Sequence, residues 1–498
     1  SEIRVSKSGG SVLYGPNALG GAINVVTALP AAGFTSSLRA GLVTDDSRDS
    51  QRSDVGGRVG YRGSNWYVQG SAFLRDQDFF RIPDAVYGPA EDGGRRENSY
   101  SRDLTTGVRL GWLGDSGAQW QLNYTRLDGR KGTPPYAGTS TEVRPRYWRW
   151  PYYDKEDVYL LGALPVSDGF WLRSRIYYDS FENRIQSYDN ASYDSQNRPY
   201  AFDSNYDDYS YGGSIEAEFS PGGAAGVTRA VLHFKDDVHR EVDDAGQPPE
   251  EMEDRSWSLA VEHTRALGGS VTGSLGLGWN ALDARRADNN VNGVITPFPL
   301  EDDAAINATA GLRWGFTPGW NFGLNLAHKT RFPTLKDRYS YRLGTALPNP
   351  DLQAEQADHV DIGIDGGLAG ASARFAVFGS WLDDAISSVS LPATSCTSPP
   401  CSQLQNVGRQ RRRGRRRHLH HRRGRRLDLI DGGAVGPGHG LLVGGRLVLV
   451  PVVVVLGHVL VVVPRDRGSV TVDRGGLADL GCRCVVGRTL TNRAVGGW

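Results

Sequence analysis

The chain has 498 residues, a formal net charge of zero, 64 glycines, 10% aromatic residues and only four cysteines. Four cysteines are too few for a small disulfide-rich scaffold, and the zero net charge averages two opposite segments. Residues 409–498 hold 18 Arg and no Lys against 5 Asp and no Glu, a net of +13, so residues 1–408 carry a net of −13. This balance leaves nucleic acid as a partner only for the basic tail.

The only methionine is Met252, so residue 1 is not a translation start. We expect the sequence to begin inside a larger protein. The absence of a signal peptide then carries no information about the cellular compartment.

The first distinctive stretch, residues 10–27, reads GSVLYGPNALGGAINVVT. Glycines at this density permit backbone conformations that other residues resist and let strands approach closely. On spacing alone, the stretch could equally be an ordinary glycine-rich hairpin. It also resembles the end of the plug domain of TonB-dependent outer-membrane receptors, in which an S-x-x-Y-G-x-x-A-x-G-G-x-I-N-x-x-T pattern precedes the first barrel strand. The resemblance assigns residues 1–30 to the end of a plug, with Tyr14, Gly15, Gly20, Gly21 and Asn24 among the matching positions.

No helical period persists over residues 31–408, where segments of about ten residues or more alternate apolar and polar side chains. In the clearest case, residues 320–327, Trp, Phe and Leu fall on one side and Asn, Gly and Ala on the other. The pattern predicts strands at 36–44, 54–63, 65–76, 100–112, 118–128, 155–166, 169–182, 209–220, 227–239, 254–266, 269–284, 305–316, 319–330, 357–367 and 370–386.

The connections between these strands are alternately short and long. Tight turns such as 115–117 and 317–319 alternate with loops of roughly twenty residues or more, for example 183–208 and 285–304. A soluble sandwich would also alternate along its strands, but outer-membrane barrels separate short periplasmic turns from long external loops. The sequence therefore favours an all-β fold, a transmembrane antiparallel β-barrel. Tryptophans near the strand ends are expected to lie in the aromatic girdles.

The loop before residue 156 has an unusual mixture of arginine and aromatic residues. Such side chains could bind an anionic, partly aromatic ligand by stacking and paired hydrogen bonds. They could instead form the outer aromatic girdle and contact lipid phosphates, and this second interpretation is the one we favour. The candidate ligand-binding residues are Arg146, Tyr147, Trp148, Arg149, Trp150, Tyr152 and Tyr153.

A second motif spans residues 330–355 and is similar to the receptors' R-x-P-T-x-x-E-x-Y and N-P-x-L-x-x-E signatures. Asp337 stands where the family has Glu. The matching residues used as site candidates are Arg331, Pro333, Thr334, Asn349, Pro350 and Glu355.

Cys396 and Cys401 flank a Thr-Ser-Pro-Pro turn and could close a small loop disulfide in an oxidising compartment. Free thiols are the alternative. No His, Cys or carboxylate cluster has metal-ligand spacing, so no metal or cofactor is expected. The scattered histidines, including His233 and His239, are expected to be polar lining of the lumen.

After residue 408 the strand pattern ends, and the composition changes to Arg, Gly, Val and Leu. Three interpretations of this tail are open: a basic arm at Arg409–Arg426, a membrane helix at Leu447–Val463, or an out-of-frame translation of GC-rich DNA. We favour the last, which predicts no native fold for residues 409–498. The family barrel has 22 strands, so about 15 or 16 would be present in residues 31–408, and the sheet could not close.

The resemblance implies an outer-membrane importer of Gram-negative bacteria, not an enzyme. Its ligand would be a small molecule such as a ferric siderophore, and the TonB–ExbB–ExbD complex would supply the energy through a segment that precedes residue 1. A passive porin-like channel and a non-functional truncated receptor are the alternatives. The sequence does not identify the ligand, because loops carry specificity.

Overall fold

The computed structural model describes residues 2–7, 10–44, 49–88, 90–140, 143, 145–198, 200–244, 246–368, 371–396, 401–421, 425–431, 452–455 and 458–461. The chain forms two compact units, residues 1–433 and 434–498. The described part of the second unit is a hairpin of β27 (Val452–Val455) and β28 (His458–Val461). No helix in the described ranges is long and apolar enough to cross a membrane.

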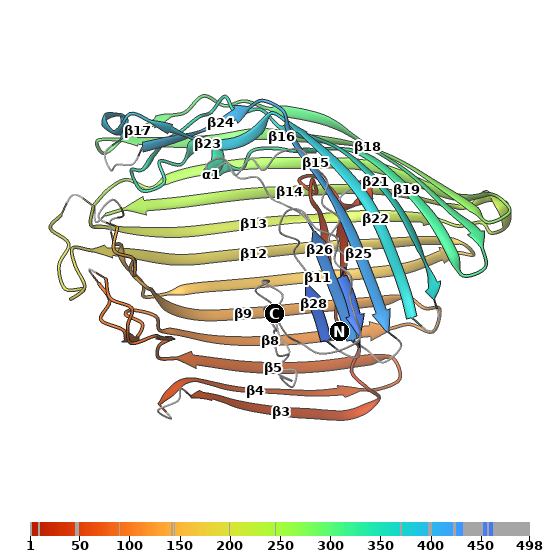
Figure 1. Cartoon of the computed structure of the whole chain (residues 1–498), viewed down its shortest axis with the longest axis horizontal. Coiled ribbons are helices and arrows are strands. Elements are labelled where there is room, and N and C mark those ends of the chain that lie inside the picture. Colours follow the sequence, from red (N-terminus) through yellow and green to blue (C-terminus); the bar gives the residue numbers. More distant parts are fainter. Residues whose placement is uncertain are drawn as a thin grey trace, which may run out of the picture. The chain divides into compact units, whose positions relative to one another are not determined.

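The first unit is dominated by one antiparallel sheet that closes into a barrel. Figure 1 shows its long strands side by side in chain order. They are β3 (Gly33–Thr44), β4 (Ser50–Arg62), β5 (Trp66–Gln77), β8 (Ser101–Leu113), β9 (Gln119–Thr133), β11 (Tyr153–Ser167), β12 (Phe170–Tyr188), β13 (Phe202–Phe219), β14 (Val227–Asp243), β15 (Glu250–Gly268), β16 (Val271–Val291), β18 (Asp303–Thr317), β19 (Trp320–Arg331), β21 (Glu355–Leu368) and β22 (Ala371–Asp383).

The all-β barrel expected from the alternating pattern is confirmed, and each predicted strand overlaps one of these long strands. The main error concerns their length, because β12 to β16 extend well into the predicted loops. Tyr188 ends β12 and Phe202 begins β13, so the connection predicted at 183–208 is shorter than expected. These extensions are polar on both faces, so they give no alternation signal. Their backbone groups nevertheless continue the ladder.

The two faces of the sheet differ as a membrane barrel requires. Large apolar side chains point outward and are exposed, for example Leu38 (83% exposed), Ile176 (62%) and Leu275 (68%). Polar side chains such as Asn123, Asn280 and Asn307 are buried. A sandwich would bury its apolar face between two sheets, whereas a barrel in lipid exposes that face.

The expectation that the sheet stays open was wrong. β25 (Gln410–His421) pairs antiparallel with β22, and β26 (Arg425–Asp431) follows and adjoins β3. Ladder pairing uses backbone groups that any sequence except proline supplies, so the change in side-chain composition after residue 408 does not end the sheet. The out-of-frame origin of residues 409–498 stays a prediction, and residues 432–451 and 462–498 lie outside the described ranges.

Shorter elements lie in the loops and at the start of the chain. The predicted strand 370–386 ends at Asp383, because Asp384 adopts a positive φ of 53° before the chain enters another sheet. The short elements are β1 (Glu2–Lys7), η1 (Val12–Tyr14), β2 (Gly21–Val26), β6 (Arg81–Ile82), β7 (Gly94–Arg95), β10 (Tyr147–Trp150), η2 (Gly223–Ala225), β17 (Val294–Pro297), α1 (Leu335–Tyr339), β20 (Ala346–Leu347), β23 (Ala385–Leu391), η3 (Ala393–Ser395) and β24 (Cys401–Val407).

Candidate functional site

The glycine-rich segment lies against the inner wall of the barrel. η1 contacts β14, β15 and β16, and its Val12 is buried in a small apolar cluster with Val231 of β14 and Ala260 of β15. Ser11 caps this turn by accepting a hydrogen bond from the Leu13 amide over 3.1 Å. The segment therefore has a defined seat on the wall rather than a free position in the lumen.

Basic side chains of the wall hold the backbone of this segment. Lys329 donates from Nζ to the Ser11 carbonyl over 3.0 Å. His233 Nε2 lies 2.9 Å from the Leu13 carbonyl oxygen, and His359 Nε2 lies 3.1 Å from that of Leu19. A carbonyl only accepts, so both rings carry their proton on Nε2.

The segment also makes a polar contact with the β19–α1 connection. The side-chain oxygen of Asn17 accepts a hydrogen bond from the Phe332 amide over 3.0 Å. Asn17 itself has a positive φ of 65°, a conformation that asparagine tolerates better than most residues. Residues 11–19 are thus tied to β14, β19 and β21 and to the chain after β19.

The five predicted plug residues have different surroundings. Tyr14 is half exposed and faces a cavity. Gly15 has a positive φ of 82°, a conformation that favours glycine, and a Cβ there would be in ordinary contact with the His233 ring at 3.4 Å. Nothing lies within 4 Å of a Cβ placed on Gly20. Gly21 and Asn24 pair with Lys7 and Arg4 in the β1–β2 hairpin.

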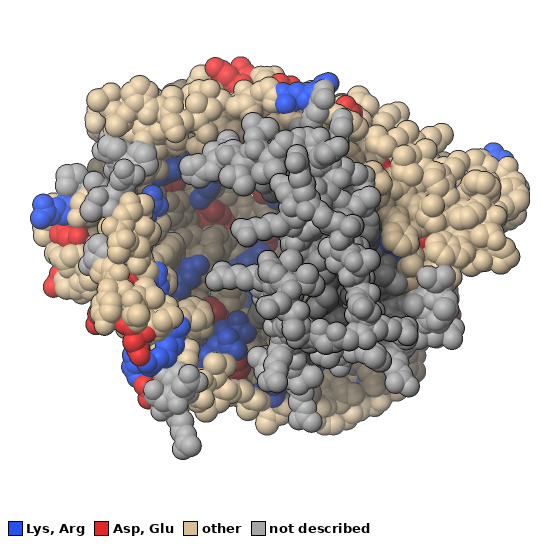
Figure 2. All heavy atoms as spheres, in the orientation of Figure 1, with Lys and Arg blue, Asp and Glu red and all other residues tan. Residues whose placement is uncertain are grey.

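A cavity of about 990 Å³ lies over this segment. Tyr14, Pro16 and Asn17 form one side of it, and residues of β9, β11 to β16, the β19–α1 connection and the start of α1 form the rest. The space-filling view shows basic and acidic side chains within the hollow beside the grey atoms (Figure 2). The aromatic side chains that face the cavity are Tyr153, Tyr177 and Phe181, whereas Tyr209, Phe234 and Trp257 lie on the outward face of the same strands.

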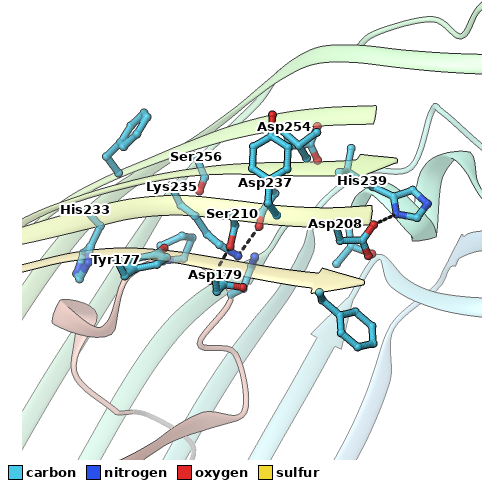
Figure 3. Close-up of a pocket in the computed structure, with 18 of the residues that line it drawn as sticks. Tyr177, Asp179, Asp208, Ser210, His233, Lys235, Asp237, His239, Asp254 and Ser256 are labelled. Atoms are coloured by element: carbon cyan, nitrogen blue, oxygen red, sulfur yellow. Dashed lines mark hydrogen bonds and ion pairs between the residues drawn. The ribbon is translucent and has the colours of Figure 1, made fainter. Parts of the chain in front are cut away.

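Charged side chains of both signs line the middle of the cavity (Figure 3). Lys235 forms an ion pair with Asp237 two residues later on β14, with Nζ 2.6 Å from Oδ1. On the neighbouring strands, Ser210 donates to Asp179 over 2.8 Å. A ligand here meets aromatic surfaces together with both cationic and anionic groups.

His239 lies toward the loop end of β14, between two carboxylates. Its Nδ1 is 2.5 Å from Asp208 Oδ1, and its Nε2 is 3.1 Å from Glu241 Oε2. Carboxylates only accept, so the protonated ring satisfies both contacts. Burial acts to lower the pKa of His239, but the hydrogen bonds to Asp208 and Glu241 outweigh it and the pKa is raised. This end of β14 lies beyond the roughly 11 residues that a strand needs to cross a bilayer.

A second cavity of about 730 Å³ lies nearer the loops. We call it the outer cavity, and we call the cavity over the glycine-rich segment the inner cavity. Lys336 of α1 lines both cavities and sits with Nζ 4.4 Å from the centre of the Tyr206 ring. That ring in turn stacks on His239 at 5.5 Å. Lys336, Tyr206, His239 and Glu241 therefore form a charged boundary between the two cavities, which we call the partition.

The outer cavity is markedly acidic on one side. Glu241, Asp243, Asp244 and Glu250 line it. Burial raises the pKa of Asp243 to about 7, and the neighbouring Glu241 carboxylate acts in the same direction. At neutral pH this carboxyl group therefore titrates at the entrance to the lumen.

The predicted arginine and aromatic tract does not form one site. Arg146, Tyr147 and Trp148 line the outer cavity, Tyr153 lines the inner one, and Arg149 lines a separate hollow. The remaining two residues make local contacts: Lys131 lies 5.1 Å from the centre of the Trp150 ring, and the Tyr152 hydroxyl donates to Asn205 over 3.1 Å.

The signature residues after β19 shape the loop that bounds both cavities. Arg331 bonds Glu355 over 2.5 Å and Asp337 over 3.2 Å. Thr334 caps α1 and exchanges hydrogen bonds with Asp337, so the Asp that replaces the family's Glu still completes a capping box. Pro333 lines the inner cavity.

The second half of the signature fastens the same loop to a small outer sheet. Asn349 donates to the Leu404 carbonyl over 2.8 Å, and Pro350 follows it. This sheet has the order β20-β24-β23. Cys396 and Cys401 form a disulfide at its edge, with their Cα atoms 5.3 Å apart.

Several residues of the site escaped the sequence analysis. Arg338 is 2% exposed and donates to Asp254 of β15 over 2.5 and 2.6 Å, which fixes α1 to the wall. Lys336 was missed as well. One sequence signal could have indicated the charged lining of the inner cavity. It is the period-two run of His233, Lys235, Asp237 and His239 on β14. Cross-strand and loop partners such as Asp254 have no such signal. Among the described residues, no group of three or more His, Cys, Asp or Glu could hold a metal ion.

Comparisons with known proteins agree on one fold. Residues 33–414 match the family model "TonB dependent receptor-like, beta-barrel". No curated protein matches the chain in sequence.

Among solved structures, the chain resembles "Copper transporter OprC", with a TM-score of 0.68 and 17% identity over 84% of this chain and 65% of that one. It also resembles the FrpB iron transporter from Neisseria meningitidis, with a TM-score of 0.64 and 15% identity over 85% of this chain and 65% of that one. The siderophore receptor PirA from Pseudomonas aeruginosa gives 0.61 and 14%, over 84% of this chain and 68% of that one. The chain therefore spans about 65% of the length of the first two.

Proposed function

Because this chain belongs to the TonB-dependent receptor β-barrel family, we propose that it imports a small organic ligand, an iron–siderophore complex, across the outer membrane. The family is one of receptors and transporters in the outer membrane of Gram-negative bacteria. No bond is made or broken in the proposed activity, so the proposal includes no catalytic step.

One observation carries this proposal: the inner cavity has the plug-motif residues Tyr14, Pro16 and Asn17 on one side and the barrel wall on the others. A passive channel needs no such obstruction in its lumen. The cavity volume of about 990 Å³ lies at the upper end of the range of small-molecule sites. A ligand that binds there touches both the wall and the segment that must move for passage.

The lining of the cavity supports an organic chelate as the ligand. Tyr153, Tyr177 and Phe181 offer flat apolar surfaces that face the lumen, on which an aromatic or extended ligand can stack. Lys235 and Lys336 provide cationic groups for an anionic chelate, while Asp237 neutralises the first of them. The names of the similar structures, which include iron and siderophore transporters, point to the same ligand class.

We further propose that the TonB–ExbB–ExbD complex energises uptake. The contacts of residues 11–19 support this view, because displacement of the segment breaks several hydrogen bonds and exposes a buried valine, and each of these losses costs free energy. The segment that contacts TonB would belong to a longer form of the protein.

The test is growth of a strain that lacks the gene on iron supplied as single defined siderophores. We expect growth to fail on one siderophore and to return when the gene is restored. Growth that is equal with and without the gene on every iron source would remove the proposed ligand class. Uptake that continues after a protonophore collapses the proton gradient would indicate a passive channel instead.

A further inference from the structure

The end of the inner cavity nearest the glycine-rich segment, which we call the floor, carries an arginine without an anionic partner. Arg175 lies on β12 and lines the cavity. Its neighbour Ile176 is 62% exposed on the outward face, so the period-two alternation of a strand directs Arg175 and Tyr177 into the lumen. Within the described ranges, Arg175 makes neither a hydrogen bond nor an ion pair.

The guanidinium group of Arg175 is nevertheless held in place. It lies 4.8 Å from the centre of the Tyr177 ring, and a cation over an aromatic face is attracted to the ring. Ser214 lies directly opposite Arg175 on β13 and lines the same cavity. In the part of the chain that the structure describes, the hydroxyl groups of Ser214 and Tyr177 also have no hydrogen-bond partner. The three side chains therefore offer a cluster of donors to a ligand.

The neighbouring arginine on the same face has a different environment. Arg173 forms ion pairs with Glu216 over 2.9 Å and with Glu218 over 3.0 Å. Two positions separate the two arginines, so both side chains point into the lumen. One arginine of β12 is thus neutralised by the protein itself, whereas Arg175 is left for a ligand.

Arg175 lies at the level of the glycine-rich segment. The register places Arg175 opposite Ser214, and Ser214 opposite His233. The Nε2 atom of His233 contacts the Leu13 carbonyl over 2.9 Å. Figure 3 shows His233 and Tyr177 together at one end of the cavity. An anion bound by Arg175 would therefore lie beside the segment that must move for passage.

A level of carboxylates lies above the floor, toward the loops. The register brings four aspartates of neighbouring strands to this level: Asp157, Asp179, Asp237 and Asp254. The last three have donors of their own, from Ser210, Lys235 and Arg338 respectively. Asp179 is four residues from Arg175, about 13 Å along an extended strand. Negative charge on a ligand is therefore favourable at the floor and unfavourable at the aspartate level.

From this arrangement we propose that Arg175, with Ser214 and Tyr177, binds a carboxylate group at one end of the imported chelate. The guanidinium fork matches a carboxylate in a paired geometry. A ferric tris-catecholate carries negative charge over its whole surface and meets the aspartate level as well. A chelate with a neutral iron core and one terminal carboxylate avoids that repulsion.

The other cations of the cavity without an ion pair in the described ranges lie on the loop side of the aspartate level. Lys155 is opposite Phe181, and Lys336 belongs to the partition. Neither lysine lies at the floor, so Arg175 decides the preference there. This inference rests on the proposed import of a ferric siderophore, and it specifies the charge of that ligand and the position of its charged end.

The test measures binding of one chelate in three charge forms to the full chain, purified in mild detergent. Desferrioxamine B is a linear trihydroxamate that forms a neutral ferric core and ends in a primary amine. Its ferric complex is used with this amine free, acetylated or succinylated, so that the end group is cationic, neutral or a carboxylate. Dissociation constants are obtained from quenching of tryptophan fluorescence.

The proteins compared are the wild type, Arg175→Gln, Arg175→Lys and Arg173→Gln. Arg173→Gln is the matched control, because Glu218 keeps Arg229 as a partner at 2.7 Å. Heat-modifiable mobility on gels reports that each variant is folded. Binding to the purified chain requires neither TonB nor a proton gradient, so the result is independent of the growth test of the proposed function.

We expect the wild type to bind the succinylated chelate about tenfold more tightly than the acetylated one, because charge-assisted hydrogen bonds are gained. Arg175→Gln should remove this preference without weakening the acetylated chelate. Arg175→Lys should restore part of the preference, and Arg173→Gln should retain all of it. Equal affinity of the wild type for the three forms, or an unchanged preference in Arg175→Gln, would overturn the proposal. So would failure of the succinylated chelate to bind the wild type at millimolar concentration.

Discussion

Lys329 of β19 donates a hydrogen bond of 3.0 Å to the backbone carbonyl of Ser11, a residue 318 positions earlier in the chain. Lys329 is 4% exposed, so its ammonium group is removed from water and this carbonyl is its hydrogen-bond acceptor. Together with the histidine contacts to Leu13 and Leu19, it attaches the glycine-rich segment to the barrel wall.

Replacement of Lys329 by methionine should loosen this segment. The variant leaves the Ser11 carbonyl without its donor, which costs about 1–3 kcal/mol when the group is buried. Hydrogen exchange of the amides of residues 12–19 should therefore become faster. Lys155→Met is the control, because Lys155 lines the same cavity without a hydrogen bond to the segment within the described ranges. Equal exchange in both variants would show that Lys329 does not hold the segment.

The Arg338→Ala variant should detach α1 from the wall. It leaves Asp254 buried without its partner, and loss of one member of a buried ion pair costs about 3–5 kcal/mol. Limited proteolysis should then cut within residues 332–354, and thermal unfolding should begin at a lower temperature. The exposed Arg342 in the same loop provides the control variant Arg342→Ala. An unchanged proteolysis pattern in Arg338→Ala would contradict the structural role of the pair.

The entrance to the lumen should lose stability as the pH rises. The pKa of Asp243 is about 7 in the folded protein against an ordinary value of 3.8, so the folded state favours the protonated form. The contribution of protonated Asp243 to the free energy of unfolding is therefore fully present below pH 3.8 and is lost as the pH rises through about 7. Asp243→Asn should flatten the decrease in melting temperature between pH 4 and 7.

Two neighbours of Asp243 set the limits of that experiment. His239 has a raised pKa, so its own contribution is lost only above its ordinary range and persists in the Asp243→Asn variant. Burial acts to raise the pKa of Glu241, but its contacts with His239 and Lys336 outweigh burial and the pKa is lowered. The contribution of Glu241 to stability is therefore lost as the pH falls, opposite to that of Asp243. A wild-type protein whose melting temperature is constant from pH 4 to 7 would contradict the assignment to Asp243.

The disulfide between Cys396 and Cys401 should stabilise the outer sheet locally. The two residues are five positions apart, and a loop this short contributes about 2 kcal/mol in the chain-entropy description. The Cys396→Ser/Cys401→Ser variant should therefore expose the amides of β23 and β24 to faster hydrogen exchange. The barrel strands, such as β14, should exchange at an unchanged rate. A uniform effect over both regions would argue against a local role.

The sequence allowed the barrel and its order of strands to be predicted, because alternation over lipid-facing segments such as residues 320–327 is a repeated signal. The ends of the strands were less predictable, because both faces of the sheet carry polar side chains there, such as Asp203 and Asp243. The site was predicted only in part. His233 and His239 were recognisable as lumen residues, but Arg338 and Asp254 meet across 84 positions and have no local pattern.

In the tail after residue 408, a clear sequence signal led to a wrong expectation about the sheet. Its composition suggested a break at residue 408, yet residues 410–421 pair with β22 along the whole of β25. Composition describes side chains, whereas the ladder depends on the backbone. The expected open edge was therefore inferred from the wrong property of the chain.

The central claim is that this barrel and its closing segment take up a ferric siderophore in an energised manner. Uptake of radiolabelled iron presented as single siderophores, by cells with and without the protein, tests it most directly. We predict receptor-dependent uptake of one siderophore that stops when the proton gradient is collapsed and falls when Tyr177 and Phe181 of the inner cavity are replaced by alanine. Uptake that is independent of the protein for every siderophore would contradict the account.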